Sequence, residues 1–177
     1  MDLEKLKFPI GKFTPLESYT KNDLDLFIND IESTPSQYRS ETENLSDEQL
    51  DTQYRPEGWT LRQVIHHIPD SHMNALIRFK LALTEDNPTI RPYFEDRWAE
   101  LSDYKMPVET SLNLIENIHS RWVNVLRRMN EKDFEKTLFH PEHNKTFTLS
   151  QMLHNYAWHS KHHLAHITEL KKSKGWK

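Results

Sequence analysis

Eleven histidines and no cysteine occur in the 177 residues, and four of the histidines fall within eight positions. His159/His163 and His162/His166 form two overlapping pairs, each spaced four residues apart. On an α-helix, residues at this spacing project from the same face. Imidazole is also the commonest side-chain ligand for metal ions in proteins. The spacing therefore predicts that at least one of the pairs binds a metal ion.

Helical phase separates the two pairs. The helix expected at 149–172 carries one apolar stripe, and at about 100° per residue His159 and His163 fall on or beside it. His162 and His166 fall progressively toward solvent. Burying two imidazoles is costly unless each finds a partner, and one shared metal ion satisfies both. The competing interpretation is a pair of hydrogen-bonded core histidines without a metal.

A third ligand is expected from a facing helix, because a catalytic zinc site usually has three protein ligands and one open position. Four upstream histidines are available for this role: His66, His67, His72 and His119. Spacing alone favours His72 or His67 and does not choose between them. Pro69 lies between these two residues and disturbs the helical phase from which a choice would be made.

Four long amphipathic helices are expected to position these side chains. The first begins after Thr20 and extends to about residue 44, with Pro35 bending or interrupting it. The other three are expected at 61–84, with a kink at Pro69, at 108–129 and at 149–172. The sequences that start at Ser46, Thr60 and Thr148 have the form of capping boxes and mark helix starts.

Two further segments precede or connect these helices. Residues 1–18 contain two prolines and a glycine, and we expect an extended arm. Residues 86–107 contain three prolines and several aromatic residues, and a connection of this length is usually functional or packed across an opening. The chain is predicted to be one all-α domain over residues 1–177. Its architecture is a four-helix bundle with an N-terminal arm and a long aromatic, proline-containing connection between helices 2 and 3.

Composition excludes several classes of function. The three glycines are too few for phosphate-cradling loops or a dinucleotide-binding fold. A net charge of −4 gives no indication of a nucleic-acid partner. The absence of cysteine removes disulfides, thiolate ligands and a cysteine nucleophile. The mean hydropathy of −0.84 and the polar N-terminus predict a soluble, cytoplasmic protein with no membrane partner.

Two stretches, residues 58–74 and residues 156–167, resemble the DinB/YfiT-like family of metal-dependent hydrolases. The resemblance implies that one histidine of the second bundle helix and an H-x-x-x-H pair of the last helix hold the metal. In this sequence these residues are His67, His159 and His163. It also implies one divalent metal per chain, with zinc expected and nickel as the alternative, and a homodimer. After His163 the chain departs from the family's usual His-Arg-Gly-Gln, which leaves the role of His166 open.

The family includes hydrolases and S-transferases that use low-molecular-weight thiols such as bacillithiol. A small-molecule substrate, with a thiol as co-substrate in the second case, is therefore expected. The last-helix pair lacks the glutamate of the His-Glu-x-x-His motif, so a hydrolytic base would have to be Asp70, Glu142, Glu169 or another histidine. A thiol transferase needs no such base because the metal itself deprotonates the thiol. S-transfer to small electrophiles is therefore the favoured hypothesis.

Two further features of the sequence have weaker implications. The arginines Arg91, Arg97 and Arg121 are candidates to meet an anionic group on the thiol, although solvated surface positions are the simpler interpretation. The alternative to an enzyme is a non-enzymatic metal-binding or stress-response bundle with a structural metal. Such a site normally has four protein ligands, and His72 or His119 would be the fourth.

Overall fold

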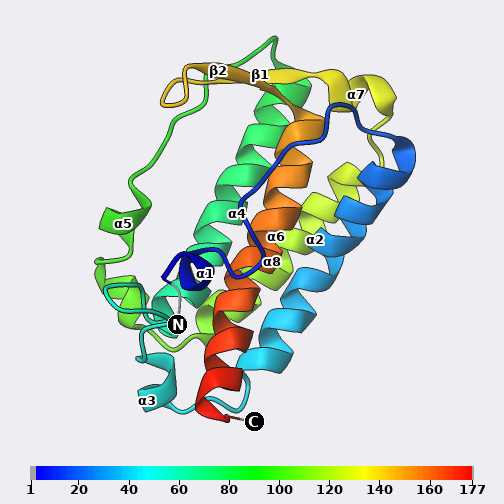
Figure 1. The fold of residues 1–177 in the computed structure, drawn as a ribbon. Coiled ribbons are helices and arrows are strands. Elements are labelled where there is room, and N and C mark those ends of the chain that lie inside the picture. Colours follow the sequence, from blue (N-terminus) through cyan, green and yellow to red (C-terminus); the bar gives the residue numbers. More distant parts are fainter. Residues whose placement is uncertain (1–2, 177) are drawn as a thin grey trace.

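The computed structural model describes residues 3–176, and four long helices form a bundle (Figure 1). They are α2 (Lys21–Thr42), α4 (Leu61–Thr84), α6 (Glu109–Leu126) and α8 (Leu149–Lys174). Helices α2 and α4 each pack against both α6 and α8, so the four helices close into a ring. The predicted all-α four-helix bundle is confirmed, with helix ends within a few residues of those expected. No helix in residues 3–176 combines the length and the apolar character that crossing a membrane requires.

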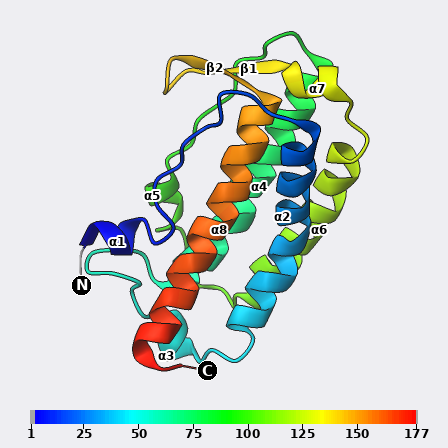
Figure 2. The ribbon, with the colours of Figure 1, turned by 45° about the vertical axis from the view of Figure 1, so that its right-hand side comes forward.

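Short elements cover the ends and one side of the bundle (Figures 1 and 2). They are α1 (Leu3–Lys7), α3 (Asp47–Leu50), α5 (Glu95–Trp98), the 3₁₀ helix η1 (Ser102–Lys105), α7 (Glu131–Glu135), β1 (Thr137–His140) and β2 (Lys145–Thr148). The N-terminal arm was expected to be extended, but it begins with the short helix α1 and has no helix or strand from residue 8 to residue 20. The antiparallel β1–β2 hairpin was not expected either: only a loop was predicted between the last two long helices.

The long connection between α4 and α6 determines the topology of the bundle. It leaves the hairpin end of α4, passes α5 and η1, and returns along the side of the bundle to the opposite end (Figures 1 and 2). Helices α4 and α6 therefore run in the same direction, while α2 and α8 run in the other. This arrangement places α4 antiparallel to α8, and the two helices face each other across the histidines described below.

Of the two effects expected of the proline in α2, a bend or an interruption, the interruption does not occur. Helix α2 is continuous from Lys21 to Thr42 with Pro35 inside it. A proline has no N–H, so it leaves the carbonyl four residues earlier without its helical partner. Here that carbonyl belongs to Ile31, and Nδ1 of His119 in α6 lies 2.5 Å from its oxygen. A side chain from a neighbouring helix thus replaces the missing backbone donor.

Two apolar clusters fill the bundle, one on the side of the hairpin and one on the side of α3. The first includes Phe27, Phe79, Trp122 and Leu153, and the second includes Tyr38, Leu61, Ile115 and Ile167. On α8 the first cluster ends at Ala157 and the second begins at Ile167, and histidines occupy the interval. We call His67, His72, His119, His159 and His163 the histidine layer.

Truncating a leucine in the first cluster should destabilise the bundle far more than truncating one on the surface. Leu153 of α8 is fully buried, whereas Leu26 of α2 is 55% exposed. Leu153→Ala should lower the free energy of unfolding by about 2–5 kcal/mol, because it removes buried apolar surface and leaves a cavity. Leu26→Ala is the matched control and should change it by less than about 0.5 kcal/mol. Urea unfolding followed by circular dichroism measures both, and equal effects would contradict the assignment of the core.

Candidate metal centre

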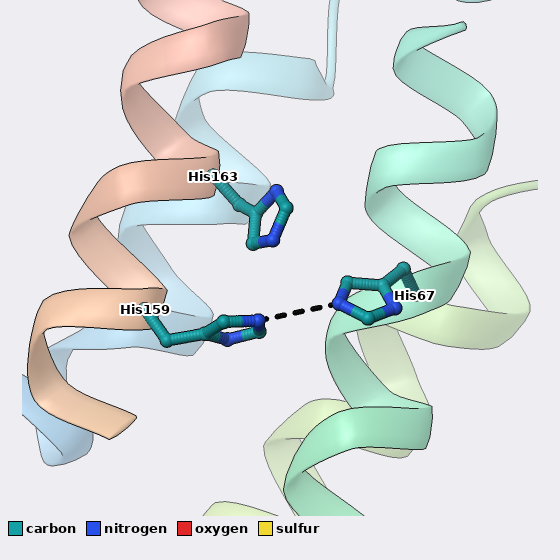
Figure 3. A group of neighbouring side chains, drawn as sticks. All are labelled: His67, His159 and His163. Carbon is teal, nitrogen blue, oxygen red and sulfur yellow. Dashed lines mark hydrogen bonds between the residues drawn. The ribbon is translucent and has the colours of Figure 1, made fainter. Parts of the chain in front are cut away.

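Three imidazoles converge between α4 and α8 (Figure 3). His67 comes from α4, while His159 and His163 lie one turn apart on α8. Nε2 of His67 is 3.2 Å from Nε2 of His159, and one ring nitrogen of each histidine lies within 4.8 Å of the other two. Two nitrogens bound tetrahedrally to zinc at about 2.0–2.1 Å are themselves about 3.3 Å apart. The three side chains therefore need only small adjustments to share one ion.

Trp59 helps to hold two of these rings in place. It immediately precedes Thr60, whose side chain caps the first turn of α4. The ring centroid of Trp59 is 4.9 Å from that of His67 and 6.4 Å from that of His163, and it is nearly parallel to the latter ring. The capping box that starts α4 thus also positions an aromatic wall beside the three imidazoles.

The protonation states of the three histidines suit a metal site. Burial lowers the pKa of His67 to about 4. Burial is also the main cause that lowers the pKa of His159 and of His163 well below the ordinary value, and the neighbouring imidazoles lower both further. The rings are therefore neutral at pH 7, which is the form that binds metal ions. Nδ1 of each ring is buried and has no hydrogen-bond partner within residues 3–176, so the protein leaves these rings incompletely satisfied. These residues fit a divalent ion.

His162 and His166 do not point toward solvent, and that expectation was wrong. Their exposed fractions are 7% and 3%, and with His163 they form a second group whose ligand atoms lie within 4.8 Å of one another. The His162 ring stacks on Trp158, and the His166 ring stacks on Tyr54. Nε2 of His166 donates to the Lys7 carbonyl. The N-terminal arm and the loop before α4 thus cover a face of α8 that its own periodicity marks as exposed.

His72 and His119 bond to each other and do not join the three-histidine group. Nδ1 of His119 donates to the Ile31 carbonyl, so in the neutral ring Nε2 is an acceptor. Nδ1 of His72 lies 2.7 Å from this Nε2 and must therefore donate to it. Nε2 of His72 is then an unprotonated nitrogen, and it has no partner among the described residues. Of the two residues that spacing favoured as the third ligand, the structure places His67 in the cluster.

His66 has a separate structural role. Its Nε2 donates to the Met106 carbonyl at 3.0 Å, and its Nδ1 accepts from the Ser111 hydroxyl at 2.6 Å. Both ring nitrogens are therefore satisfied by protein groups. This histidine anchors α4 to the end of the long connection and to α6.

The three-histidine group lines a cavity of about 860 Å³. Small-molecule sites commonly have volumes of a few hundred to about a thousand Å³. The walls come from segments far apart in the sequence, and they include Phe13, Tyr54, Trp59, Tyr93, His140, Phe147 and Tyr156. The arm and the aromatic connection therefore both reach the site, in line with the expectation that such a connection packs across an opening.

The charged residues of this cavity differ from those expected. Arg91, Arg97 and Arg121 are exposed and do not line it. The arginines in its wall are Arg55 and Arg78. Sequence reasoning missed Arg78 although a signal was present: it lies eleven residues after His67, which at about 100° per residue returns to nearly the same face of the helix.

Only one of the three carboxylates considered as a general base reaches the cavity. Glu142 lines it from the β1–β2 turn and is exposed. Asp70 accepts a hydrogen bond from the Tyr104 hydroxyl at 2.8 Å, and Glu169 is exposed; neither lines the cavity. Within residues 3–176, no carboxylate belongs to the three-histidine group.

Acid should destabilise the metal-free protein, and His119 should account for a measurable part of the effect. Burial lowers the pKa of His119 to about 4, whereas the unfolded chain titrates near its ordinary value of 6.5. As the pH falls between these values, the unfolded state takes up a proton that the folded state does not. The stability present above about pH 6.5 is therefore lost toward pH 4, by about 2 kcal/mol between about pH 7 and about pH 4.5. His119→Gln should lose that much less than the wild type over this range. Chemical denaturation at several pH values measures this, and equal losses would contradict it.

Comparison with known proteins agrees with the fold. The model of the DinB superfamily matches residues 30–167. A Bacillus cereus protein named "Putative metal-dependent hydrolase" is 50% identical over 174 residues, which cover 98% of this chain and 100% of that protein. YfiT from Bacillus subtilis, described as "a probable metal-dependent hydrolase with an unusual four-helix bundle topology", superposes with a TM-score of 0.95. It is 46% identical, and the match covers 98% of this chain and 99% of YfiT.

A more distant likeness is to a mycothiol-dependent maleylpyruvate isomerase, with a TM-score of 0.61 and 18% identity. It covers 82% of this chain and 63% of the isomerase, and it shows a shared fold alone. The family match and the near-complete relatives carry the assignment. The chain belongs to the DinB superfamily, within its YfiT-like group.

Proposed function

We propose that this protein is a metal-dependent enzyme in which His67, His159 and His163 hold one divalent ion at the wall of the cavity. The observation that carries the proposal is the convergence of three neutral, incompletely satisfied imidazoles beside a space of about 860 Å³. The name of the B. cereus relative supports metal dependence. Three imidazoles and an open position suit zinc best, and nickel is the alternative.

A divalent ion at this position would lower the pKa of a water molecule or deprotonate a thiol. The residues around it decide which nucleophile is used. Hydrolysis calls for a general base within hydrogen-bond reach of the reacting water. Within residues 3–176, four carboxylates line the cavity, and all four are exposed: Glu57, Glu95, Asp96 and Glu142. The names of the relatives favour hydrolysis, whereas this lack of a buried carboxylate favours a thiol.

We therefore favour transfer of a small electrophile to a low-molecular-weight thiol. The S–H proton passes to solvent as the thiolate forms, the new S–C bond forms at the electrophilic carbon, and the leaving group departs with its bonding electron pair. Trp59 and Tyr156 line the space where the electrophile would bind, and the buried rings exclude water around it. Hydrolysis at the same centre is the alternative reaction, and the names of the relatives support it.

The non-enzymatic alternative, a structural metal with four protein ligands, requires His72 or His119 as the fourth ligand. His72 and His119 are hydrogen-bonded to each other and through His119 to the Ile31 carbonyl. Recruiting His119 would break this chain inside the core, and Nε2 of His72, although unpaired, does not belong to the group of ligand atoms that lie within 4.8 Å of one another. The arrangement therefore favours a three-ligand centre with an open position.

Metal binding should depend on the three histidines and not on a fourth histidine of the same helix. His67→Ala and His163→Ala should each weaken zinc binding by at least about 100-fold, because each removes a direct ligand. His154→Ala is the matched control, since His154 also lies on α8 but stacks on Phe27 away from the cluster. Metal analysis and competitive chelator titration of folded protein measure the change. Stoichiometric metal at unchanged affinity in both ligand variants would remove the basis of the proposal.

The choice between the two reactions can be made with zinc-loaded protein. Bacillithiol and a small electrophile should form a thioether faster with the wild type than without protein, and His67→Ala should abolish the acceleration. Mass spectrometry of the product and loss of free thiol report the reaction. Turnover of esters or amides without any thiol, combined with no thioether formation, would replace S-transfer by hydrolysis.

A further inference from the structure

Two arginines of α4 are equally buried, but only one of them is paired with carboxylates. Arg62 and Arg78 each have an exposed fraction of 9%. Arg62 binds two carboxylates, with Nε 2.6 Å from Asp51 and a terminal nitrogen 2.7 Å from Asp47. Arg78 forms no ion pair with any carboxylate in residues 3–176. Buried charges in proteins are normally paired, so Arg78 requires a specific explanation.

The hydrogen bonds of Arg78 hold its guanidinium in place without neutralising it. One terminal nitrogen donates to the Tyr156 hydroxyl at 2.9 Å, and the other donates to the Arg91 carbonyl at 3.3 Å. Both acceptors are uncharged. A guanidinium has five N–H donors, so these contacts leave several of them free. Arg78 lines the same cavity as the three-histidine group.

A second unsatisfied group lines the same cavity as Arg78. His140, at the end of β1, is 7% exposed and lines the cavity, and its Nδ1 has no hydrogen-bond partner among the described residues. Burial is the main cause that lowers the pKa of His140, and the charges of His143 and Arg78 lower it further. Arg78 and His140 both line this cavity, and they come from α4 and β1, which pack against each other. An imidazole N–H and a free guanidinium edge together suit an anionic oxygen group.

Tyr156 sets the separation between this pair and the three-histidine group. Its hydroxyl accepts from Arg78, while its ring centroid lies 6.2 Å from that of His159. The guanidinium and the histidine cluster are therefore separated by about the length of a tyrosine side chain. A ligand that reaches both must carry its charge several bonds away from its reacting atom.

We propose that Arg78 and His140 form an anion subsite that binds a carboxylate on the substrate or on the thiol co-substrate. The planar guanidinium suits a carboxylate because it can donate two parallel hydrogen bonds to the two oxygens. The reacting end of the same molecule faces the three histidines, and this part of the inference rests on the proposed function. The class of ligand is a small monocarboxylate with a chain of several atoms between the charged end and the reacting end.

The test compares ligands that differ only in charge. In the first arm, calorimetry measures binding of hexanoate and of 1-hexanol to metal-free protein, so that the carboxylate cannot bind a metal. In the second arm, 6-mercaptohexanoate and 6-mercaptohexanol bind to zinc-loaded protein. A charge-assisted hydrogen bond should make the carboxylate bind about 10-fold or more tightly than the alcohol. A preference in the second arm assigns the carboxylate to the thiol, and a preference confined to hexanoate assigns it to the electrophile. The absence of a preference in both arms overturns the subsite.

Variants connect the preference to Arg78. Arg78→Gln should abolish it, while Arg78→Lys should keep part of it because the positive charge remains. Arg97→Gln is the matched control, since Arg97 is exposed outside the cavity, and it should bind as the wild type does. A preference that survives in folded Arg78→Gln protein would also overturn the proposal. If Arg78→Gln does not fold, the wild-type comparison and Arg78→Lys decide the question.

Metal content, measured on every sample, separates this proposal from the proposed function. A wild-type protein that binds no metal but still prefers hexanoate would remove the proposed function and leave the subsite. A protein that binds metal at the three histidines but does not discriminate by charge would remove the subsite and leave the proposed function.

Discussion

The layer of histidines between two apolar clusters is the feature on which the rest of this structure depends. A neutral imidazole brings one donor and one acceptor into the core, and each nitrogen left unpaired there costs about 1–3 kcal/mol. His72 and His119 reduce this cost by bonding to each other and to the Ile31 carbonyl. His67, His159 and His163 have only the contact between two Nε2 atoms, and their Nδ1 atoms are unpaired within residues 3–176. A bundle stabilised by its core alone would place leucines at these positions, and the ion that we propose for the three rings would offset this cost.

A proline outside the site helps to separate the two groups of histidines. Pro35 frees the Ile31 carbonyl, and this carbonyl can only accept, so it determines which nitrogen of His119 carries the proton. That tautomer in turn makes His119 an acceptor for His72. His72 of α4 is thereby hydrogen-bonded to α6, although its ring centroid is only 5.7 Å from that of His159. Pro35 thus helps to position a fourth imidazole beside the three-histidine group without making it a member of that group.

The parts of the molecule that follow from local periodicity could be predicted, and those that depend on contacts between distant segments could not. The four helices follow from spacing within single segments, and so do the capping boxes that start α3, α4 and α8 and the inward phase of His159 and His163. The choice of His67 over His72 depended on family resemblance, because it is decided by hydrogen bonds between three helices. The burial of His162 and His166 is caused by the arm and by Tyr54, which no helical wheel of α8 contains. The β1–β2 hairpin was missed because its strands have only four residues each. The homodimer and the cytoplasmic location stay predictions.

The cavity is built from two kinds of structure, and they have different consequences for specificity. The three histidines, Tyr156 and Arg78 stand on α4 and α8, where packing against the other helices fixes their backbone. Phe13, Tyr93 and His140 come from the arm, the long connection and the hairpin, which cross the bundle without being part of its core ring. Residues on packed helices hold their geometry better than residues on connecting segments. The distance between the reacting end and the charged end of a ligand is therefore set by the bundle. The shape and size of the part between them are set by the segments that cover it, and a change there would alter which molecule is accepted without moving the three histidines.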